Sequence, residues 1–214
     1  MRERSVKNIL SKAGGLYTGP RGFSLLEMLI AMAVGLVVLG AMYSVFNIQN
    51  KTFSNQEEIV AMQQSVRAGM DIMAREIGMA GYDPTFLNSD ANVVNDFNGV
   101  TVNASQLQIQ ADLDGSGDID ATSQENVVYA FNTTNKRITR NIGSGAQPFV
   151  ENVDAFTFEY LDGSDNVTAV STAVRQIRIT ITGRTAKPDS SYTTNGGYRT
   201  YRLTSVIAPR NLAL

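Results

Sequence analysis

The strongest hydrophobic pattern of the chain lies near its N-terminus. An uncharged run of 19 residues, MLIAMAVGLVVLGAMYSVF, extends from Met28 to Phe46. As an α-helix this run would rise about 28 Å, which is close to the thickness of the hydrocarbon core of a bilayer. The pattern predicts a helix over residues 23–46 that is long enough to cross a membrane.

A second, amphipathic pattern follows the uncharged run. Apolar side chains recur at the spacing of one helix face, at Ile59, Met62, Val66, Met70, Met73 and Ile77. No proline interrupts residues 23–83, and Gly78, Gly81 and the Asp83-Pro84 pair supply stop signals. We predict an amphipathic helix over residues 47–82, continuous with the first, whose apolar stripe packs against the C-terminal part of the chain.

Beyond Pro84 the sequence changes to residues that favour strands and turns. Period-two alternation is clearest in RQIRITIT at residues 175–182, which predicts an antiparallel strand with one wet face. Strands are expected at residues 100–110, 126–132, 137–141, 155–161, 174–182 and 198–208, with an irregular loop at 86–98. The predicted fold is α+β, a long N-terminal helix packed on a C-terminal antiparallel sheet domain at residues 83–214.

Charge is distributed unevenly along the 214 residues. Residues 1–22 hold five basic side chains and one acid, although the whole chain has a formal net charge of −2. By the positive-inside tendency, we expect the basic end in the cytoplasm and the chain after Asn47 outside it. The remainder is mildly acidic and has no basic stretch, so no nucleic-acid partner is expected.

The residue types present narrow the possible chemistry. The chain has no cysteine and no histidine, which excludes thiol nucleophiles, Ser-His-Asp triads and Cys/His zinc sites. A hydrolase that uses two carboxylates needs only Asp or Glu, but no pair of them stands out in the sequence. We predict that the protein is not an enzyme and requires no cofactor.

The uncharged run has three ordinary explanations, and each meets a difficulty. A cleaved secretory signal has a shorter apolar region that ends at a small-residue cleavage site. A plain membrane anchor tolerates the carboxylate of Glu27 poorly, because charge within an apolar segment is costly and is usually functional. A buried core helix leaves the basic residues before it unexplained. The residues around Glu27 therefore decide the interpretation.

The sequence from Arg21 to Glu27, RGFSLLE, stands directly before the uncharged run. It resembles the class III signal of type IV prepilins and pseudopilins. The resemblance implies a leader peptide at residues 1–22, which a prepilin peptidase removes by cutting between Gly22 and Phe23. It also implies N-methylation of the new N-terminal residue, Phe23.

The same resemblance gives Glu27 a role in assembly. In this family the glutamate is thought to meet the N-terminal amine of a neighbouring subunit. The chemistry is consistent, because the amine of Phe23 and the carboxylate of Glu27 are opposite charges one helical turn apart. Each would otherwise be an expensive unpaired ion in an apolar environment. The uncharged helix is expected to need membrane lipid first and other pilins of a filament afterwards.

A softer resemblance extends along the rest of the chain. It is similar to PilW-type minor pilins and, less closely, to J-type pseudopilins of type II secretion, in the helix ending MAGY at 79–82 and in YRLTSV at 201–206. This implies a minor pilin for type IV pilus assembly or initiation, which contacts an inner-membrane pilus assembly platform. Its expected location is the bacterial inner membrane, with a periplasmic C-terminal domain, and then the pilus. A type II secretion pseudopilin and a membrane-anchored periplasmic binding or adhesion module remain alternatives.

An aspartate-rich segment, DLDGSGDID at residues 112–120, follows the oxygen-ligand spacing of an EF-hand calcium loop. The position that should hold a bidentate glutamate is Ser123, and Glu125 lies two residues late. The pattern predicts either a weak calcium site or an acidic surface loop between two strands. The candidate ligands are Asp112, Asp114, Ser116, Asp118 and Asp120.

Overall fold

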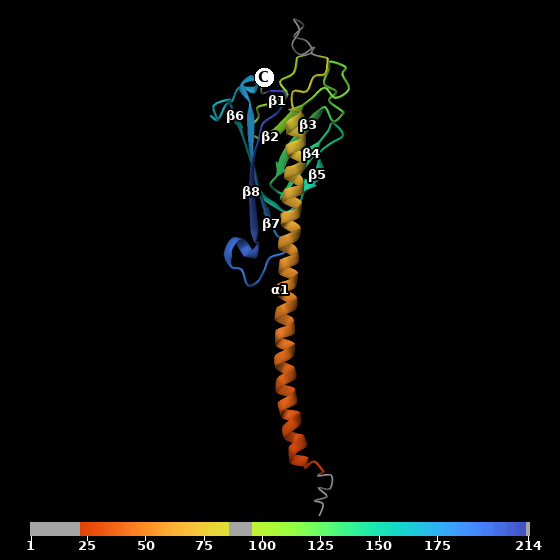
Figure 1. Cartoon of the computed structure of the whole chain (residues 1–214), viewed down its shortest axis with the longest axis vertical. Helices are drawn as coiled ribbons and strands as arrows, with labels where there is room; N and C mark the ends of the chain where they lie inside the picture. Colours follow the sequence, from red (N-terminus) through yellow and green to blue (C-terminus); the bar gives the residue numbers. More distant parts are fainter. Residues whose placement is uncertain (1–21, 86–95, 213–214) are drawn as a thin grey trace, which may run out of the picture. The chain divides into compact units, whose positions relative to one another are not determined.

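The computed structural model describes residues 22–85 and 96–212. The predicted leader before Gly22 and most of the predicted loop at 86–98 lie outside the described residues. The chain divides into two compact units, unit 1 (Met1–Asn50) and unit 2 (Lys51–Leu214). The long helix α1, Leu25–Met79, begins in unit 1 and ends in unit 2 (Figure 1).

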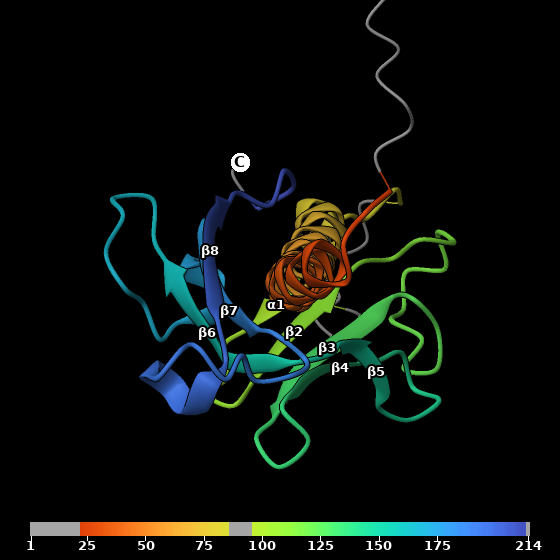
Figure 2. The same ribbon diagram turned by 90° about the horizontal axis from the view of Figure 1, so that it is seen from below.

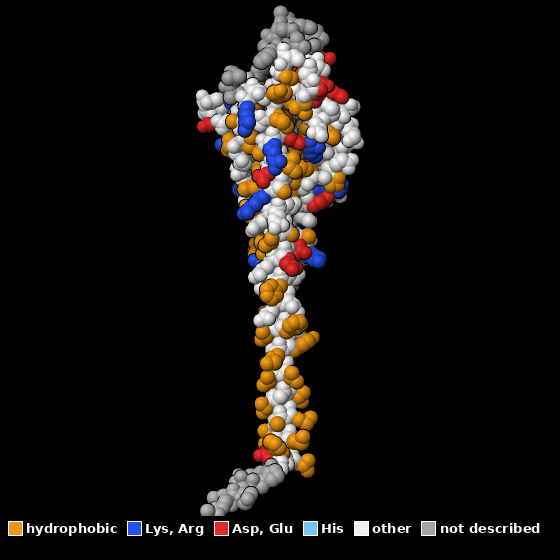
Figure 3. All heavy atoms as spheres, turned by 45° about the vertical axis from the view of Figure 1, so that its right-hand side comes forward, with side chains coloured by type: hydrophobic (Ala, Val, Ile, Leu, Met, Phe, Trp, Pro, Cys, Tyr) orange, Lys and Arg blue, Asp and Glu red, His pale blue; other side chains and the backbone are white. Residues whose placement is uncertain are grey.

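In unit 1, the described residues form the uncharged part of α1. Every residue from 22 to 50 is exposed except Gly35, which is half-buried. The helix is long and apolar enough to cross a membrane, and hydrophobic side chains project along it in Figure 3. This part of the helix buries none of its large apolar side chains within the chain.

In unit 2, α1 has one buried face. Its buried residues are Met62, Val66, Gly69, Met70, Met73 and Ile77, which match the predicted stripe from Met62 onward. After Met79 the chain leaves the helix through Gly81, whose φ of +76° is easily adopted only by a residue without a side chain. The helix therefore ends where the glycine and proline signals predicted.

The strands of unit 2 form two antiparallel sheets. The first has the order β1-β2-β3-β4-β5 and the second the order β6-β7-β8 (Figure 1). Together with α1 they confirm the predicted α+β fold. The bounds are β1 Val100–Thr101, β2 Gln106–Gln110, β3 Asn126–Asn132, β4 Arg137–Asn141, β5 Gln147–Val150, β6 Val153–Leu161, β7 Gln176–Arg184 and β8 Thr200–Ile207.

Both sheets contribute to one core against the buried face of α1 (Figure 2). Two glycines permit the close approach, since a Cβ on Gly69 would collide with Val150 of β5. A Cβ on Gly183 of β7 would lie 2.5 Å from Val66 of α1. Contacts this short are closer than a side chain can tolerate. At these two points the backbone of a glycine therefore contacts a side chain of the neighbouring element.

Strand β7 shows the predicted alternation most clearly. Ile177, Ile179 and Ile181 are completely buried, whereas the residues between them are half-exposed. Successive side chains of a strand point to opposite faces, so one face of β7 faces the core and the other faces water. The expectation of an antiparallel strand with one wet face is confirmed.

Two strand predictions were wrong in detail. The single strand expected at 100–110 is a hairpin of β1 and β2, because Asn103 turns the chain by accepting the Ser105 N–H at 2.9 Å. Strand β5 was not predicted, since its four residues include Pro148, which disfavours strand structure in a sequence. It pairs with β4 as an edge strand, where the missing N–H is tolerated.

Candidate processing and assembly site

The predicted processing point lies directly before α1. Gly22, Phe23 and Ser24 precede the first helical residue and have no regular secondary structure. Phe23 is 86% exposed, and a side chain added at Gly22 would meet no atom within 4 Å. In the described residues, the peptide bond between Gly22 and Phe23 is thus accessible.

Glu27 and Ser24 form a reciprocal hydrogen-bonded pair at the start of α1. The Ser24 N–H and hydroxyl donate to Glu27 Oε2 at 3.0 and 3.2 Å, and the Glu27 N–H donates to Ser24 Oγ at 3.2 Å. This is a capping box, which satisfies two of the N–H groups that a helix start leaves without intrahelical partners. The carboxylate also stabilises the positive end of the helix dipole.

The role of Ser24 was missed from the sequence, although the signal was present. Ser-x-x-Glu before an apolar run is a recognised helix-start pattern. The sequence analysis considers only amines as partners of Glu27, that of Phe23 and that of a neighbouring subunit. The structure shows that its carboxylate already has hydrogen-bond donors within its own chain.

At the aspartate-rich loop, the structure brings together Asp112 and Asp114, from the start of the segment, and Glu125, which follows the segment. One carboxylate oxygen of each lies within 4.8 Å of the others. Asp112 is fully buried and Glu125 is 4% exposed, whereas Asp114 is exposed. Glu125, which stands two residues late in the calcium pattern, thus lies beside the first two predicted ligands.

Backbone N–H groups surround these carboxylates. Asp112 accepts from Gly115 and Gly117 at 2.8 and 2.9 Å. Glu125 accepts through Oε1 from Leu113 and Asp114 at 2.9 and 3.1 Å. No Lys or Arg forms an ion pair with the three carboxylates within the described residues.

The remaining predicted ligands shape the loop. Hydrogen bonds from Ser116 lower the pKa of Asp114, and those from Thr122 lower the pKa of Asp120. The Ser116 hydroxyl donates to the Asp118 carbonyl at 3.3 Å. Neither Asp118 nor Asp120 belongs to the group of close carboxylates, which consists of Asp112, Asp114 and Glu125.

A half-buried charge cluster fixes α1 to the first sheet. Arg140 of β4 donates to Glu76 of α1, with its Nη2 at 2.7 Å from Glu76 Oε1. The hydroxyl of Tyr129 on β3 also donates to Glu76. Burial, reinforced by this carboxylate, raises the pKa of Tyr129 well above its usual range. The cluster is a structural link, because its three members are one another's partners.

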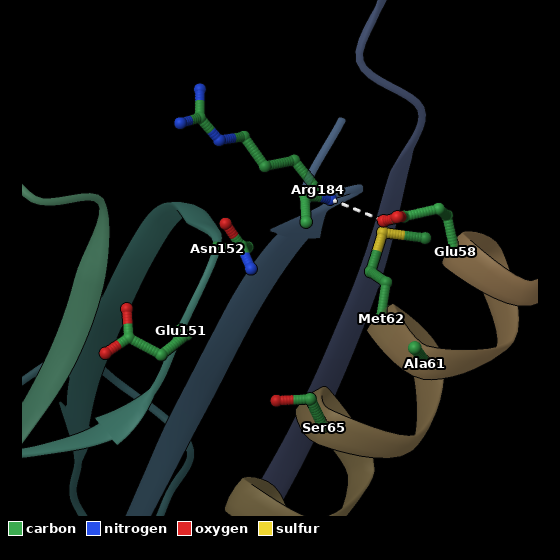
Figure 4. A pocket seen from close by; sticks show the side chains of 8 residues that line it. Glu58, Ala61, Met62, Ser65, Glu151, Asn152 and Arg184 are labelled. Atoms are coloured by element: carbon green, nitrogen blue, oxygen red, sulfur yellow. Dashed lines mark hydrogen bonds between the residues drawn. The ribbon is translucent and has the colours of Figure 1, made fainter. Parts of the chain in front are cut away.

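A notch of about 190 Å³ lies between α1 and the sheets. Figure 4 shows Glu58, Met62 and Ser65 of α1 facing Glu151 and Asn152. Both acids already have partners, since Glu58 accepts the Ala186 N–H at 3.2 Å and Glu151 pairs with Arg137 at 3.5 Å. The two carboxylates of the notch thus join parts of unit 2, whereas the buried Nε of Arg184 has no hydrogen-bond partner within the described residues.

Two family models match the chain. The model of the prokaryotic N-terminal methylation motif matches residues 19–43, which include the capping box. The model of prepilin peptidase-dependent protein B matches residues 55–200, more than half of the chain. The chain belongs to the prepilin peptidase-dependent protein B family.

The match to the methylation motif confirms the resemblance seen at residues 21–27. The protein is type IV pilin-like. Proteins of this kind are structural subunits, so the expectation that the chain is not an enzyme is confirmed on family grounds. The methylation motif and the apolar part of α1 together make its N-terminal region a membrane anchor.

Among solved structures, a type IV-like pilin from Thermus thermophilus is similar to this member of the family. The TM-score is 0.42 at 15% sequence identity, and the match covers 71% of this chain and 97% of that chain. A search of curated proteins found no match.

Proposed function

We propose that this protein is a minor pilin that takes part in type IV pilus assembly or initiation. The observation that carries the proposal is the methylation motif at residues 19–43, followed in the first half of α1 by apolar side chains that are exposed all round. Such a surface requires a covering of lipid or of other apolar helices. A filament of related subunits supplies the second kind of covering.

Processing is the first step of the proposed function. The prepilin peptidase cuts between Gly22 and Phe23, and Phe23 becomes a methylated N-terminus. The exposure of both residues before the first helical turn supports this step. A protease needs an accessible backbone, and a peptide bond inside the hydrogen-bonded helix would be protected.

Glu27 then guides assembly. Its carboxylate has hydrogen-bond donors in Ser24, but no cationic partner among the described residues. The N-terminal amine of a neighbouring subunit would add the missing positive charge. In an apolar filament core such a pair is strongly favoured over two separate ions.

The proposed topology follows from the charge distribution. Basic residues before Gly22 stay in the cytoplasm, and unit 2 lies in the periplasm before incorporation into a pilus. The partners are the prepilin peptidase, membrane lipid, the inner-membrane assembly platform and other pilins. The β-rich domain is the part that would contact neighbours outside the membrane.

Mass spectrometry of the protein purified from its own cells tests the proposal. We expect a mature chain that begins at methylated Phe23. The Gly22→Val variant should remain full length, while the matched Gly35→Val variant should be processed, because Gly35 lies in the helix and has open space around it. An intact N-terminus in the wild-type protein would contradict the proposed function.

Gene deletion separates the minor pilin from its two alternatives. Loss of surface pili with normal secretion supports the minor pilin, and loss of secreted enzymes with normal pili supports a type II secretion pseudopilin. A membrane-anchored binding or adhesion module would leave both processes intact. Complementation by wild-type protein and by Glu27→Ala distinguishes a direct role of this subunit from an effect on neighbouring genes.

We also propose that the aspartate-rich loop binds calcium through Asp112, Asp114 and Glu125, with oxygens of Ser116, Asp118 and Asp120 as further predicted ligands. The grouping of three carboxylate oxygens within 4.8 Å supports it, since Ca²⁺ prefers several oxygen ligands. Calcium should raise the melting temperature of the detergent-solubilised protein. Asp114→Ala should abolish the increase. An unchanged melting temperature in the wild type would contradict the calcium site and favour the alternative, an acidic surface loop between two strands.

A further inference from the structure

The strands of unit 2 leave sheet edges of different kinds. β1 has only two residues, and β5 contains Pro148, which cannot donate a ladder hydrogen bond. β8 has eight residues without proline and pairs with β7 on one side only, as far as the described residues go. On its open side, backbone N–H and C=O groups point away from the sheet. β8 is thus an edge strand that is neither very short nor interrupted by proline, the two features that protect β1 and β5 from pairing with another strand.

The side chains of β8 are also incompletely covered. Tyr201, Leu203 and Ile207 face the core but are only half-buried, unlike the completely buried Ile179 and Ile181 of the neighbouring strand. A further strand beside β8 would cover such side chains on the same face of the sheet. The edge therefore offers both backbone partners and apolar surface.

A groove lies beside the end of β8. Its volume is about 580 Å³, and it is lined by Ala74, Arg75, Gly78 and Met79 of α1 together with Ile207, Ala208 and Arg210. Gly78 has open space where a Cβ would point. The backbone of another segment can approach α1 closely there, because no side chain intervenes.

The groove carries positive charge. Arg75 and Arg210 are exposed and form no ion pair within the described residues. No Asp or Glu lines the groove. Guanidinium groups bind carboxylates through paired hydrogen bonds. The charge therefore selects an acidic occupant.

We propose that an extended, acidic segment of a different pilin-like subunit adds to the open edge of β8 and places its carboxylates against Arg75 and Arg210. The assignment of the partner to a pilin-like subunit rests on the proposed function. Main-chain bonds to β8 supply affinity and the groove supplies specificity, as in other cases of strand addition. Symmetric pairing of two copies through β8 would bring like charges together, so a different subunit is expected.

Cross-linking in intact cells with a zero-length carbodiimide reagent tests the proposal. This reagent joins an amine to a carboxylate in direct contact, so the Arg75→Lys and Arg210→Lys variants keep the charge and allow a covalent bond to form. Peptide mass spectrometry should find position 75 or 210 joined to Asp or Glu of another pilin-like subunit. The control is the native Lys136, at the turn between β3 and β4 of the other sheet, which should give no such product.

A groove-filling variant provides a second, independent measurement. Gly78→Leu meets no described atom at its Cβ and should leave the melting temperature unchanged or higher, since glycine weakens a helix. We expect this variant to lower about tenfold the amount of the partner subunit, as identified by cross-linking, that co-purifies without cross-linker. Gly163→Leu serves as the matched control, because Gly163 has ordinary spacing to its only neighbouring atom within 4 Å, on Arg175.

The outcomes separate this inference from the proposed function. A methylated Phe23 with no cross-link at position 75 or 210, or with a cross-link to a second copy of this chain, overturns the inference but leaves the proposed function intact. Normal co-purification of Gly78→Leu overturns it as well. An unprocessed N-terminus contradicts the proposed function itself.

Discussion

The two halves of α1 present different surfaces although they belong to one helix. In unit 1 the apolar side chains surround the helix and are exposed, whereas in unit 2 one stripe of them is buried against the sheets. A helix that is hydrophobic all round needs a surrounding apolar medium, and a striped helix needs one packed face. The first half therefore depends on lipid or other chains, and the second half is stabilised by its own domain.

The largest test of this difference uses the same substitution in both halves. Met73 is completely buried and Met32 is 68% exposed. Met73→Ala should lower the free energy of unfolding of unit 2 by about 4 kcal/mol, through lost burial and the remaining cavity. Met32→Ala should leave it unchanged. Denaturant unfolding followed by tyrosine fluorescence measures both free energies. Equal losses in the two variants would contradict the difference between the two halves of α1.

The next largest effect concerns the charge that holds the second half of α1 to the first sheet. Glu76→Ala leaves Arg140 and Tyr129 without their shared acceptor and should cost about 3 kcal/mol. Glu159→Ala removes the partner of Arg178 in an exposed pair and should cost less than about 1 kcal/mol. The same denaturant experiment compares them. A similar loss in both would show that the partial burial of the Glu76 cluster is unimportant.

A smaller effect is expected at the start of the first half. Ser24→Ala removes the capping box and should destabilise the first turn of α1 by about 1 kcal/mol. Hydrogen exchange of the Glu27 amide in detergent should become about fivefold faster. Ser44→Ala, a change within the same helix, should leave that amide unaffected. An unchanged exchange rate in Ser24→Ala would argue against the cap.

The smallest expected effect is a pH dependence in unit 2. Hydrogen bonds from Ser191, together with those from Arg199, hold the pKa of Asp189 well below its usual range. A carboxyl group with a depressed native pKa stabilises the fold above its unfolded pKa of about 3.9, and this stability is lost as pH falls toward the native value. Asp189→Asn should therefore show a shallower loss of stability below about pH 4. Acid titration of unfolding measures the slope.

Local signals predicted most of the fold. The bounds of β3 and β4 agree with the predicted strands, because an alternating segment and a polar turn mark each of them. The end of α1 follows from Gly81 and Pro84. The hairpin of β1 and β2 was not separated, since its turn at Asn103 contains neither glycine nor proline.

The candidate site was less predictable where it depends on tertiary packing. Gly22, Phe23 and Glu27 follow from their order in the chain, and their proposed roles remain predictions. The proximity of Glu125 to Asp112 depends on the chain path between them, including the turn in which the Ser123 N–H donates to the Asp120 carbonyl. The groove beside β8 joins Gly78 to Arg210, which are far apart in the sequence, so no local pattern reveals it.

The capping box has a kinetic consequence for the proposed assembly. A bare carboxylate entering an apolar environment would first lose its water, which creates a high barrier. Glu27 instead enters with donors from Ser24 already in place. In the proposed assembly the neighbouring amine would then join or replace these donors, and the carboxylate would never lack a hydrogen bond. In this proposal, subunit addition exchanges one set of hydrogen-bond donors to the Glu27 carboxylate for another.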